Sequence, residues 1–110
     1  MKIQSIGTVI ANRTLTLSNG NVVIISIGKP DKFPDSDDFY CPYSISGIGK
    51  EIVSYAGGVD DIQALCLALN KIGAYLYTTE QAKSGELLWN GGANLGFPVP
   101  DTIRDLLPDA

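Results

Sequence analysis

The sequence predicts an α+β domain: an antiparallel β-meander of four to five strands with one main helix packed on one face. Three observations support this fold class. Two pairs of strand-like segments are each joined by a glycine-containing turn, one helical segment follows them, and the later periodic segments are short. The 110 residues are long enough for one core, so residues 1–110 are expected to form a single α+β domain.

The first two strands are expected at residues 8–17 and 21–28, where apolar residues alternate along the chain. Their register depends on the turn between them. A two-residue turn would place apolar residues opposite threonines, whereas a three-residue turn with Gly20 left-handed pairs Leu15 with Val23. We predict the three-residue turn, because the odd-numbered apolar residues of both strands then share a face.

A second hairpin is expected at residues 39–58, after an acidic loop at residues 29–38. Its turn is placed at residues 47–50, where permissive glycines explain the sequence without a phosphate-binding role. One face of this hairpin is expected to carry Tyr43, Ile45, Val53 and Tyr55.

The main helix is expected within residues 57–76, with Asp60 as its N-terminal cap and Gln63 completing a capping box. Two apolar strips run along it at helical spacing. The strip expected to face the sheet comprises Ile62, Leu65, Cys66, Leu69, Ile72, Gly73 and Leu76. The second strip comprises Ala64, Leu67, Ala68 and Tyr75. We expect this second strip to contact either the C-terminal segment or a second copy of the chain in a homodimer.

The rest of the chain is less regular. A short strand is expected at residues 86–90, an irregular segment at residues 91–100 and one or two helical turns at residues 101–110. The apolar residues of the last segment are Ile103, Leu106 and Leu107. Three aromatic residues either line a ligand pocket near this segment or close the core, namely Tyr77, Trp89 and Phe97.

Composition argues against several function classes. The net charge of −4 and the scattered lysines and arginines argue against nucleic acid or an anionic membrane as a partner. No apolar run could span a membrane and no targeting segment is visible, so a cytoplasmic location is expected. Histidine is absent, which removes the common catalytic pairs and zinc sites. We therefore expect no enzyme activity, no cofactor and no metal, with Cys41 and Cys66 as buried free thiols.

The acidic loop is the most distinctive candidate for partner binding. Clustered carboxylates can steer a basic protein, and an aromatic side chain among them can supply a desolvated contact. The candidate contact residues are Asp31, Phe33, Asp35, Asp37, Asp38 and Phe39. A calcium site is the alternative, but the loop lacks the glycine and the distal glutamate of an EF-hand, and a plain solvated loop is the simplest explanation.

The helix also resembles a segment found in a family of small uncharacterised bacterial proteins, a domain of unknown function. The matching residues are Gly58, Asp60, Gln63, Ala64, Leu65, Ile72 and Gly73. This resemblance implies a bacterial origin and carries no known activity or catalytic residue.

Three functions are compatible with these observations. The first is a non-enzymatic protein-binding module, most concretely an immunity or antitoxin-type inhibitor of a partner protein. The second is a homodimer that associates through the second helical strip. The third is a small-molecule binder or an enzyme that uses carboxylates and aromatic residues. The first is favoured because it needs an acidic, compact domain and no catalytic apparatus.

Overall fold

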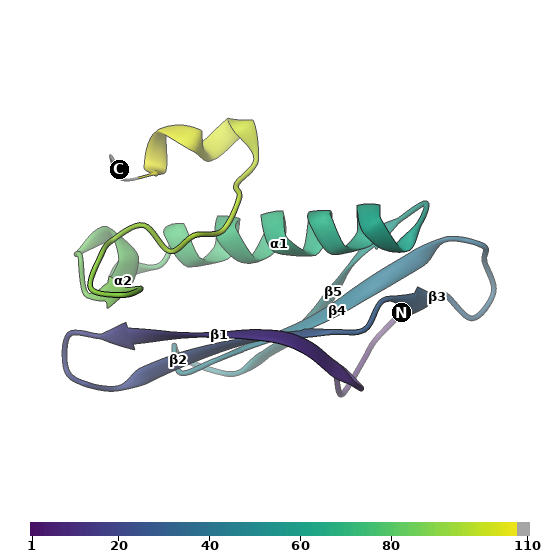
Figure 1. Cartoon of the computed structure of the whole chain (residues 1–110), viewed down its shortest axis with the longest axis horizontal. Coiled ribbons are helices and arrows are strands. Elements are labelled where there is room, and N and C mark those ends of the chain that lie inside the picture. The colour runs from purple at the N-terminus through teal and green to yellow at the C-terminus, as the bar shows by residue number, and fades with distance from the viewer. Residues whose placement is uncertain (108–110) are drawn as a thin grey trace.

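The computed structural model describes residues 1–107 and shows an antiparallel sheet with one long helix on one face (Figure 1). β4 pairs with β5 along one edge and with β2 and β3 along the other, while β1 lies between β2 and β6. The predicted α+β meander is therefore confirmed. The strands are β1 (Val9–Leu17), β2 (Val22–Gly28), β3 (Asp31–Lys32), β4 (Phe39–Ser46), β5 (Ile52–Gly58) and β6 (Leu87–Leu88).

The β1–β2 hairpin has the predicted register. Leu15 pairs with Val23, and the Leu17 amide donates a hydrogen bond to the Asn21 carbonyl at 2.8 Å. Gly20 has a φ of +91°, a conformation that glycine adopts without steric cost. The three-residue turn is confirmed, and it directs the odd-numbered residues of both strands toward the helix.

The β4–β5 hairpin turns where it was expected, but the prediction for its faces was wrong. Ile45 pairs with Ile52, and Ser44 pairs with Val53. An even number of residues, 46–51, lies between the paired residues Ile45 and Ile52, so odd positions of β4 pair with even positions of β5. Tyr43 and Ile45 therefore face the helix and are buried, whereas Val53 and Tyr55 lie on the opposite side of the sheet.

The long helix α1 spans Asp61–Tyr77 and begins as predicted. The carboxylate of Asp60 accepts a hydrogen bond from the Gln63 amide at 2.7 Å, and the Gln63 side chain accepts one from the Val59 amide at 2.7 Å. These bonds satisfy backbone donors that the first turn of a helix leaves free. α1 packs on β4 and β5, and a short helix, α2 (Glu80–Lys83), follows it.

The predicted division of α1 into two strips was wrong. Ala64 and Ala68, assigned to the second strip, are completely buried. Ile62 is 68% exposed and Cys66 is exposed, although both were assigned to the sheet-facing strip. Three groups of residues describe α1 instead. Ala64, Ala68, Ile72 and Leu76 form its centre line, Leu65, Leu69 and Tyr75 are half-buried, and Leu67 is 41% exposed.

Small residues, Ala64 and Ala68, occupy the N-terminal half of the centre line, where the start of the helix lies very close to the sheet. A Cβ atom added at Gly58 on β5 would collide with the backbone of Ala64. A leucine facing the sheet at this point would hold the two elements apart, so the larger leucines flank the contact. Ala64 and Ala68 are consequently not accessible to a second copy of the chain.

The C-terminal segment covers the part of the core that α1 leaves open. We call residues 95–99 the strap. Leu95, Phe97 and Val99 are buried, and the backbone of the strap crosses α1 at Gly73, where a Cβ atom would meet the Pro98 carbonyl oxygen. The strap is followed by a 3₁₀ helix, η1 (Asp101–Leu106), which lies above α1 in Figure 1.

The C-terminal residues contact the rest of the chain intramolecularly. Ile103 and Leu107 are partly buried against the core, while the side chain of Leu106 is outside the described residues.

The backbone N–H and C=O groups of Leu95 in the strap form hydrogen bonds with side chains. Its amide donates to the Tyr77 hydroxyl at 2.8 Å, and its carbonyl accepts a hydrogen bond from the Arg13 guanidinium at 3.0 Å.

The two long edges of the sheet differ. At β5, the Lys71 amine donates a hydrogen bond to the Tyr55 carbonyl at 2.8 Å, so a side chain of α1 occupies a backbone acceptor of this strand. At the other edge, β6 pairs only with Thr16 and Leu17 of β1. The remainder of β1 has no strand on its outer side in the described part of the chain.

We predict that Gly73→Ala destabilises the protein. A glycine-to-alanine change inside an ordinary helix stabilises it by about 1 kcal/mol, but here the new methyl group would push the strap away at Pro98. We expect a loss of about 1–3 kcal/mol in the free energy of unfolding, the usual cost of overpacking. Urea denaturation measures it, with Cys66→Ala on the exposed side of α1 as the control. A gain in stability would contradict the close contact.

Candidate functional site

The sheet face opposite α1, here called the outer face, carries no charged side chain at the positions of its four long strands, β1, β2, β4 and β5, and one at the short strand β3, where Asp31 pairs with Tyr40. Directly paired residues point to the same side of a sheet, so the row Thr14, Ile24 and Ser46 lies on this face. Val22 and Ile24 are 47% and 40% exposed, so the face is not fully polar. The residues of the outer face are Asn12, Thr14, Thr16, Val22, Ile24, Ser26, Asp31, Tyr40, Pro42, Ser44, Ser46, Val53, Tyr55, Gly57 and Leu88.

An aromatic cluster occupies one end of the outer face. The ring of Phe33 lies 5.3 Å from that of Tyr40 and 5.8 Å from that of Tyr55, centroid to centroid. The two tyrosine rings are 5.9 Å apart in an edge-to-face arrangement. Phe33 also covers Gly57, which leaves room for the ring. All three rings are half-buried, so the cluster offers apolar surface while holding the following loop in place.

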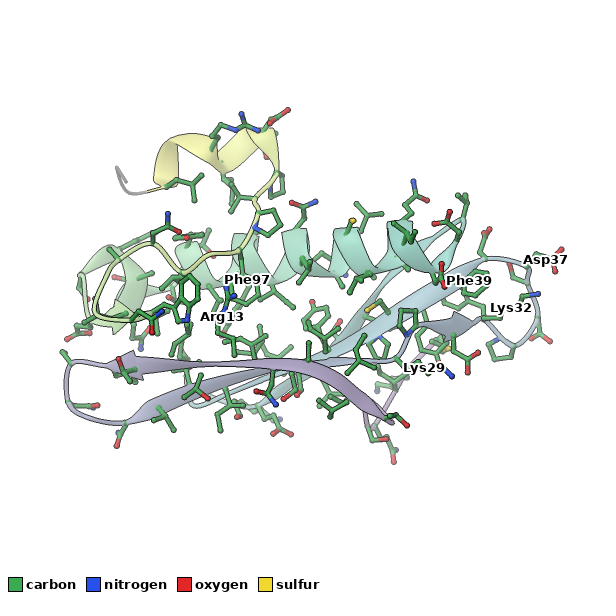
Figure 2. All side chains as sticks on the ribbon, in the orientation of Figure 1. Arg13, Lys29, Lys32, Asp37, Phe39 and Phe97 are labelled. Carbon is green, nitrogen blue, oxygen red and sulfur yellow. The ribbon has the colours of Figure 1, made fainter. Side chains whose placement is uncertain are left out.

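The acidic loop is an ordered hairpin tip next to this cluster. The Phe33 amide donates to the Asp38 carbonyl at 3.0 Å, and the Asp38 amide donates to the Ser36 hydroxyl at 3.0 Å. Asp31 lies in β3, where its carboxylate accepts a hydrogen bond from the Lys32 amide. Asp35, Asp37 and Asp38 are exposed at the tip, which Figure 2 shows projecting from the end of the sheet at Asp37.

The structure places the two candidate aromatic anchors of this loop on opposite faces of the sheet. Phe33 belongs to the outer face, whereas Phe39 pairs with Gly58 and packs against the core on the helix side. The Lys32 amine lies 5.9 Å from the centroid of the Phe39 ring, and both residues are labelled in Figure 2. Within residues 1–107, no three metal-ligating side chains converge, and the acidic tip is no exception.

A second site lies on the helix side of the sheet, around Arg13. Its guanidinium stacks on the Trp89 ring with 3.8 Å between the guanidinium carbon and the ring centroid, and it lies 5.0 Å from the Phe97 ring. Gly96, with a φ of +77°, is needed here because a side chain would collide with both Trp89 and Arg13. Of the three aromatic residues considered for a pocket, Tyr77 is buried and bonded to the strap, while Trp89 and Phe97 frame the arginine.

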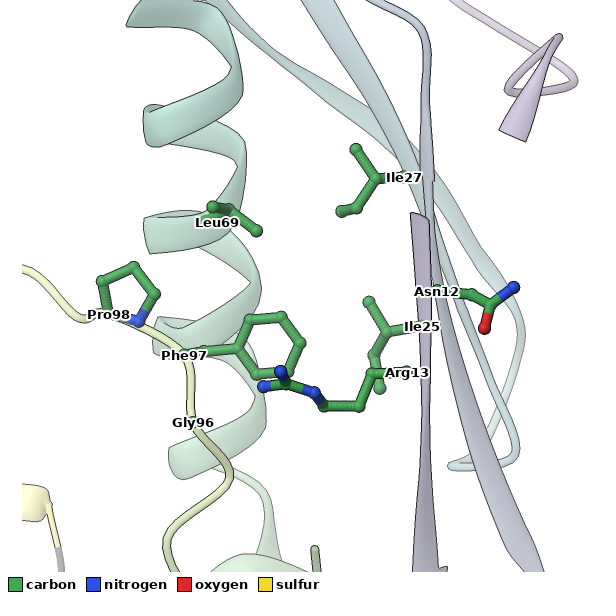
Figure 3. A pocket seen from close by; sticks show the side chains of 8 residues that line it. All are labelled: Asn12, Arg13, Ile25, Ile27, Leu69, Gly96, Phe97 and Pro98. Atoms are coloured by element: carbon green, nitrogen blue, oxygen red, sulfur yellow. The ribbon is translucent and has the colours of Figure 1, made fainter. Parts of the chain in front are cut away.

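A hollow of about 180 Å³ adjoins the Arg13 guanidinium. Figure 3 shows the guanidinium directed toward Phe97, with Ile25, Ile27 and Leu69 around the same space. Arg13 was not predicted as a site residue from the sequence. The signal was present in the register, because Arg13 shares the odd-numbered, inward-facing positions of Leu15 and is the only charged residue of β1.

The two thiols have different environments, and the prediction that both are buried was wrong for Cys66. Cys41 is completely buried, and burial raises the pKa of its thiol to about 11. Burial also raises the pKa of Tyr43, an effect that a hydrogen bond to Ser54 partly offsets. Cys66 is exposed on α1. Because a thiolate is the reactive form of cysteine, Cys41 is an inert core residue in the folded protein.

We predict that the folded chain has one fast-reacting thiol at mild alkaline pH. Ellman's reagent is expected to modify Cys66 rapidly and Cys41 only after unfolding, and Cys66→Ala should remove the fast phase. The pKa of Cys41 rises on folding from 9.0 to about 11, so its contribution to stability is complete below pH 9.0 and is lost as the pH rises toward 11. Rapid modification of folded Cys66→Ala would contradict this assignment.

Within the described residues no helix has the length and apolar character needed to cross a membrane. The curated proteins and the solved structures contain no match to the chain. One family of proteins does match, over residues 11–99, which include the outer face, the acidic tip and the Arg13 site. This match confirms that the chain resembles a family whose function is unknown. The chain belongs to the family described as a domain of unknown function, DUF6968.

Proposed function

We propose that this protein is a non-enzymatic protein-binding module whose outer face contacts the partner. The observation that carries the proposal is the absence of charged side chains from the outward positions of β1, β2, β4 and β5, together with the exposure of Val22 and Ile24. The solvated face of an antiparallel sheet is ordinarily polar. Depletion of charge with exposed apolar and aromatic residues is instead typical of the central part of a protein interface.

The acidic tip extends this surface toward a basic partner. Asp35, Asp37 and Asp38 lie beyond the aromatic cluster, so an apolar contact region has an acidic margin at one end. Charges at the margin of an interface raise the association rate more than the affinity. Because Phe33 is packed on the outer face, we assign it to the apolar contact region. We assign the carboxylates of the acidic tip to the electrostatic attraction of the approaching partner.

A specific form of this function is an immunity or antitoxin-type inhibitor in the bacterial cytoplasm. An inhibitor of this kind acts by covering a partner's surface and needs no catalytic group of its own. The net charge of −4 supports a basic target and offers no basic surface for nucleic acid or an anionic membrane. The absence of histidine from the chain also supports a role without catalysis.

A homodimer is the second candidate, supported by a different surface. Val59 and Ile62, at the start of α1, are 70% and 68% exposed, and Cys66 lies one turn further along the helix. Residues spaced by three or four positions on a helix are neighbours, so they form one apolar patch. Light scattering distinguishes the candidates, because Val59→Asp should dissociate a dimer that uses this patch.

We predict that the outer face contacts the partner. A photoreactive amino acid placed at position 24, in the chain expressed in its native cells, should form an adduct with a partner protein, whereas placement at position 59 should not. With the purified partner, Ile24→Asp should weaken binding by about tenfold or more, the cost of burying an unpaired charge. The fold should persist because Ile24 is exposed. Adducts at position 59 alone would favour the helix patch and contradict this proposal.

We further predict that the acidic tip accelerates association. Replacement of Asp31, Asp35, Asp37 and Asp38 by asparagine should lower the association rate constant at low salt and flatten its dependence on ionic strength, with little effect on dissociation. Stopped-flow mixing across a salt series measures both. The control is Glu80→Gln with Glu86→Gln, which removes negative charge at α2 and β6. An unchanged rate and salt dependence would remove the loop from the interface.

A further inference from the structure

We propose that the hollow beside Arg13 binds a carboxylate attached to a single apolar group, with the Arg13 guanidinium as the anion contact. The site lies on the helix side of the sheet, away from the outer face. It therefore stands independently of the protein-binding function proposed above.

The guanidinium has hydrogen-bonding capacity that the chain does not use. One of its N–H groups donates to the Leu95 carbonyl at 3.0 Å, whereas a guanidinium has five N–H donors. Among the side chains that the structure describes, no acidic group lies within ion-pair distance of Arg13, and no nitrogen is both fully buried and unbonded. The remaining donors of Arg13 are therefore accessible from outside, where they match the two oxygens of a carboxylate.

The chemistry of the hollow defines the rest of the ligand. Its walls include Ile25, Ile27, Leu69, Phe97 and Pro98, and none of these side chains carries a charge or a hydrogen-bonding group. Drug-sized ligands occupy pockets of roughly 300–1,000 Å³. The hollow, at about 180 Å³, is smaller and suits one branched aliphatic or aromatic group.

The guanidinium is held rigidly enough to serve as a binding group. Trp89 stacks on one side of it, and the absence of a side chain at Gly96 allows the strap to lie against both residues. Holding the Leu95 carbonyl requires only one N–H donor, so this structural role does not by itself explain the use of a guanidinium. The placement of a permanent positive charge without an acidic neighbour, in a chain with net charge −4, indicates that the counter-charge comes from a ligand.

Two sources could supply such a group: a small free carboxylic acid, or the C-terminal residue of a polypeptide. Trp89 is the only tryptophan of the chain and stacks directly on Arg13, so its fluorescence reports on the site. The full chain is titrated with isocaproate, with isocaproamide, with a short peptide ending in leucine as the free acid, and with the same peptide amidated.

We expect a saturable change in Trp89 fluorescence with a free acid and binding weaker by about tenfold or more for the matching amide, since the charge-assisted hydrogen bond is lost. Response to isocaproate would identify a small acid as the source, and response to the peptide acid alone would identify a polypeptide C-terminus. Equal binding of acid and amide, or no saturable change with any of the four, would overturn the proposal.

Variants test the site without removing the residue that holds the strap. Leu69→Phe should fill the hollow while leaving Arg13 and Trp89 in place, and should weaken binding of the acid by about tenfold or more. Leu67→Phe, on the exposed side of the same helix, is the matched control and should bind as the original chain does. Full affinity in folded Leu69→Phe would overturn the assignment of the hollow.

Discussion

The width of the sheet is the constraint on which the rest of the structure depends. A helix is about 10 Å across and adjacent strands lie about 4.8 Å apart, so a single helix covers roughly two strands of a sheet. α1 lies over β4 and β5. The inward side chains of β1 and β2, among them Leu15, Val23 and Ile25, must be shielded by something else, and the chain uses irregular backbone for this purpose.

Irregular backbone over a core must find hydrogen-bond partners outside regular structure. At Leu95 these partners are Tyr77 from α1 and Arg13 from β1. Arg13 therefore holds the strap through one N–H group. The other N–H groups of its guanidinium are available for the carboxylate contact proposed above. Where the cover is incomplete, between the strap, α1 and the first two strands, the hollow remains.

Local patterns in the sequence predicted the elements, the first hairpin register and the N-terminus of α1, because alternation, Gly20 and the Asp60 cap act over a few residues. The faces were harder to predict. Hydrophobicity ranks Leu65 above Ala64, but the close approach at Gly58 selects the smaller residue for the contact. The distance between a helix and a sheet is a property of the tertiary structure, and the spacing of residues in the sequence does not reveal it.

The candidate sites were hard to predict for the same reason: the sequence did not show which face of the sheet each side chain would occupy. Phe33 and Phe39 are close in sequence, yet the turn between β3 and β4 sends them to opposite faces. The acidic loop itself was recognisable because four aspartates fall within residues 31–38. Arg13 could have been found by applying the predicted register to charged residues as well as to apolar ones.

The unequal edges of the sheet limit how the protein can self-associate. A strand added at β5 would have to displace Lys71 from the Tyr55 carbonyl, and lysine at a sheet edge is a recognised barrier to strand addition. The outer side of β1 beyond β6 has no strand partner in the described chain. In a fibril each copy pairs at both edges, so growth beyond two copies joined through β1 would require Lys71 to leave the Tyr55 carbonyl.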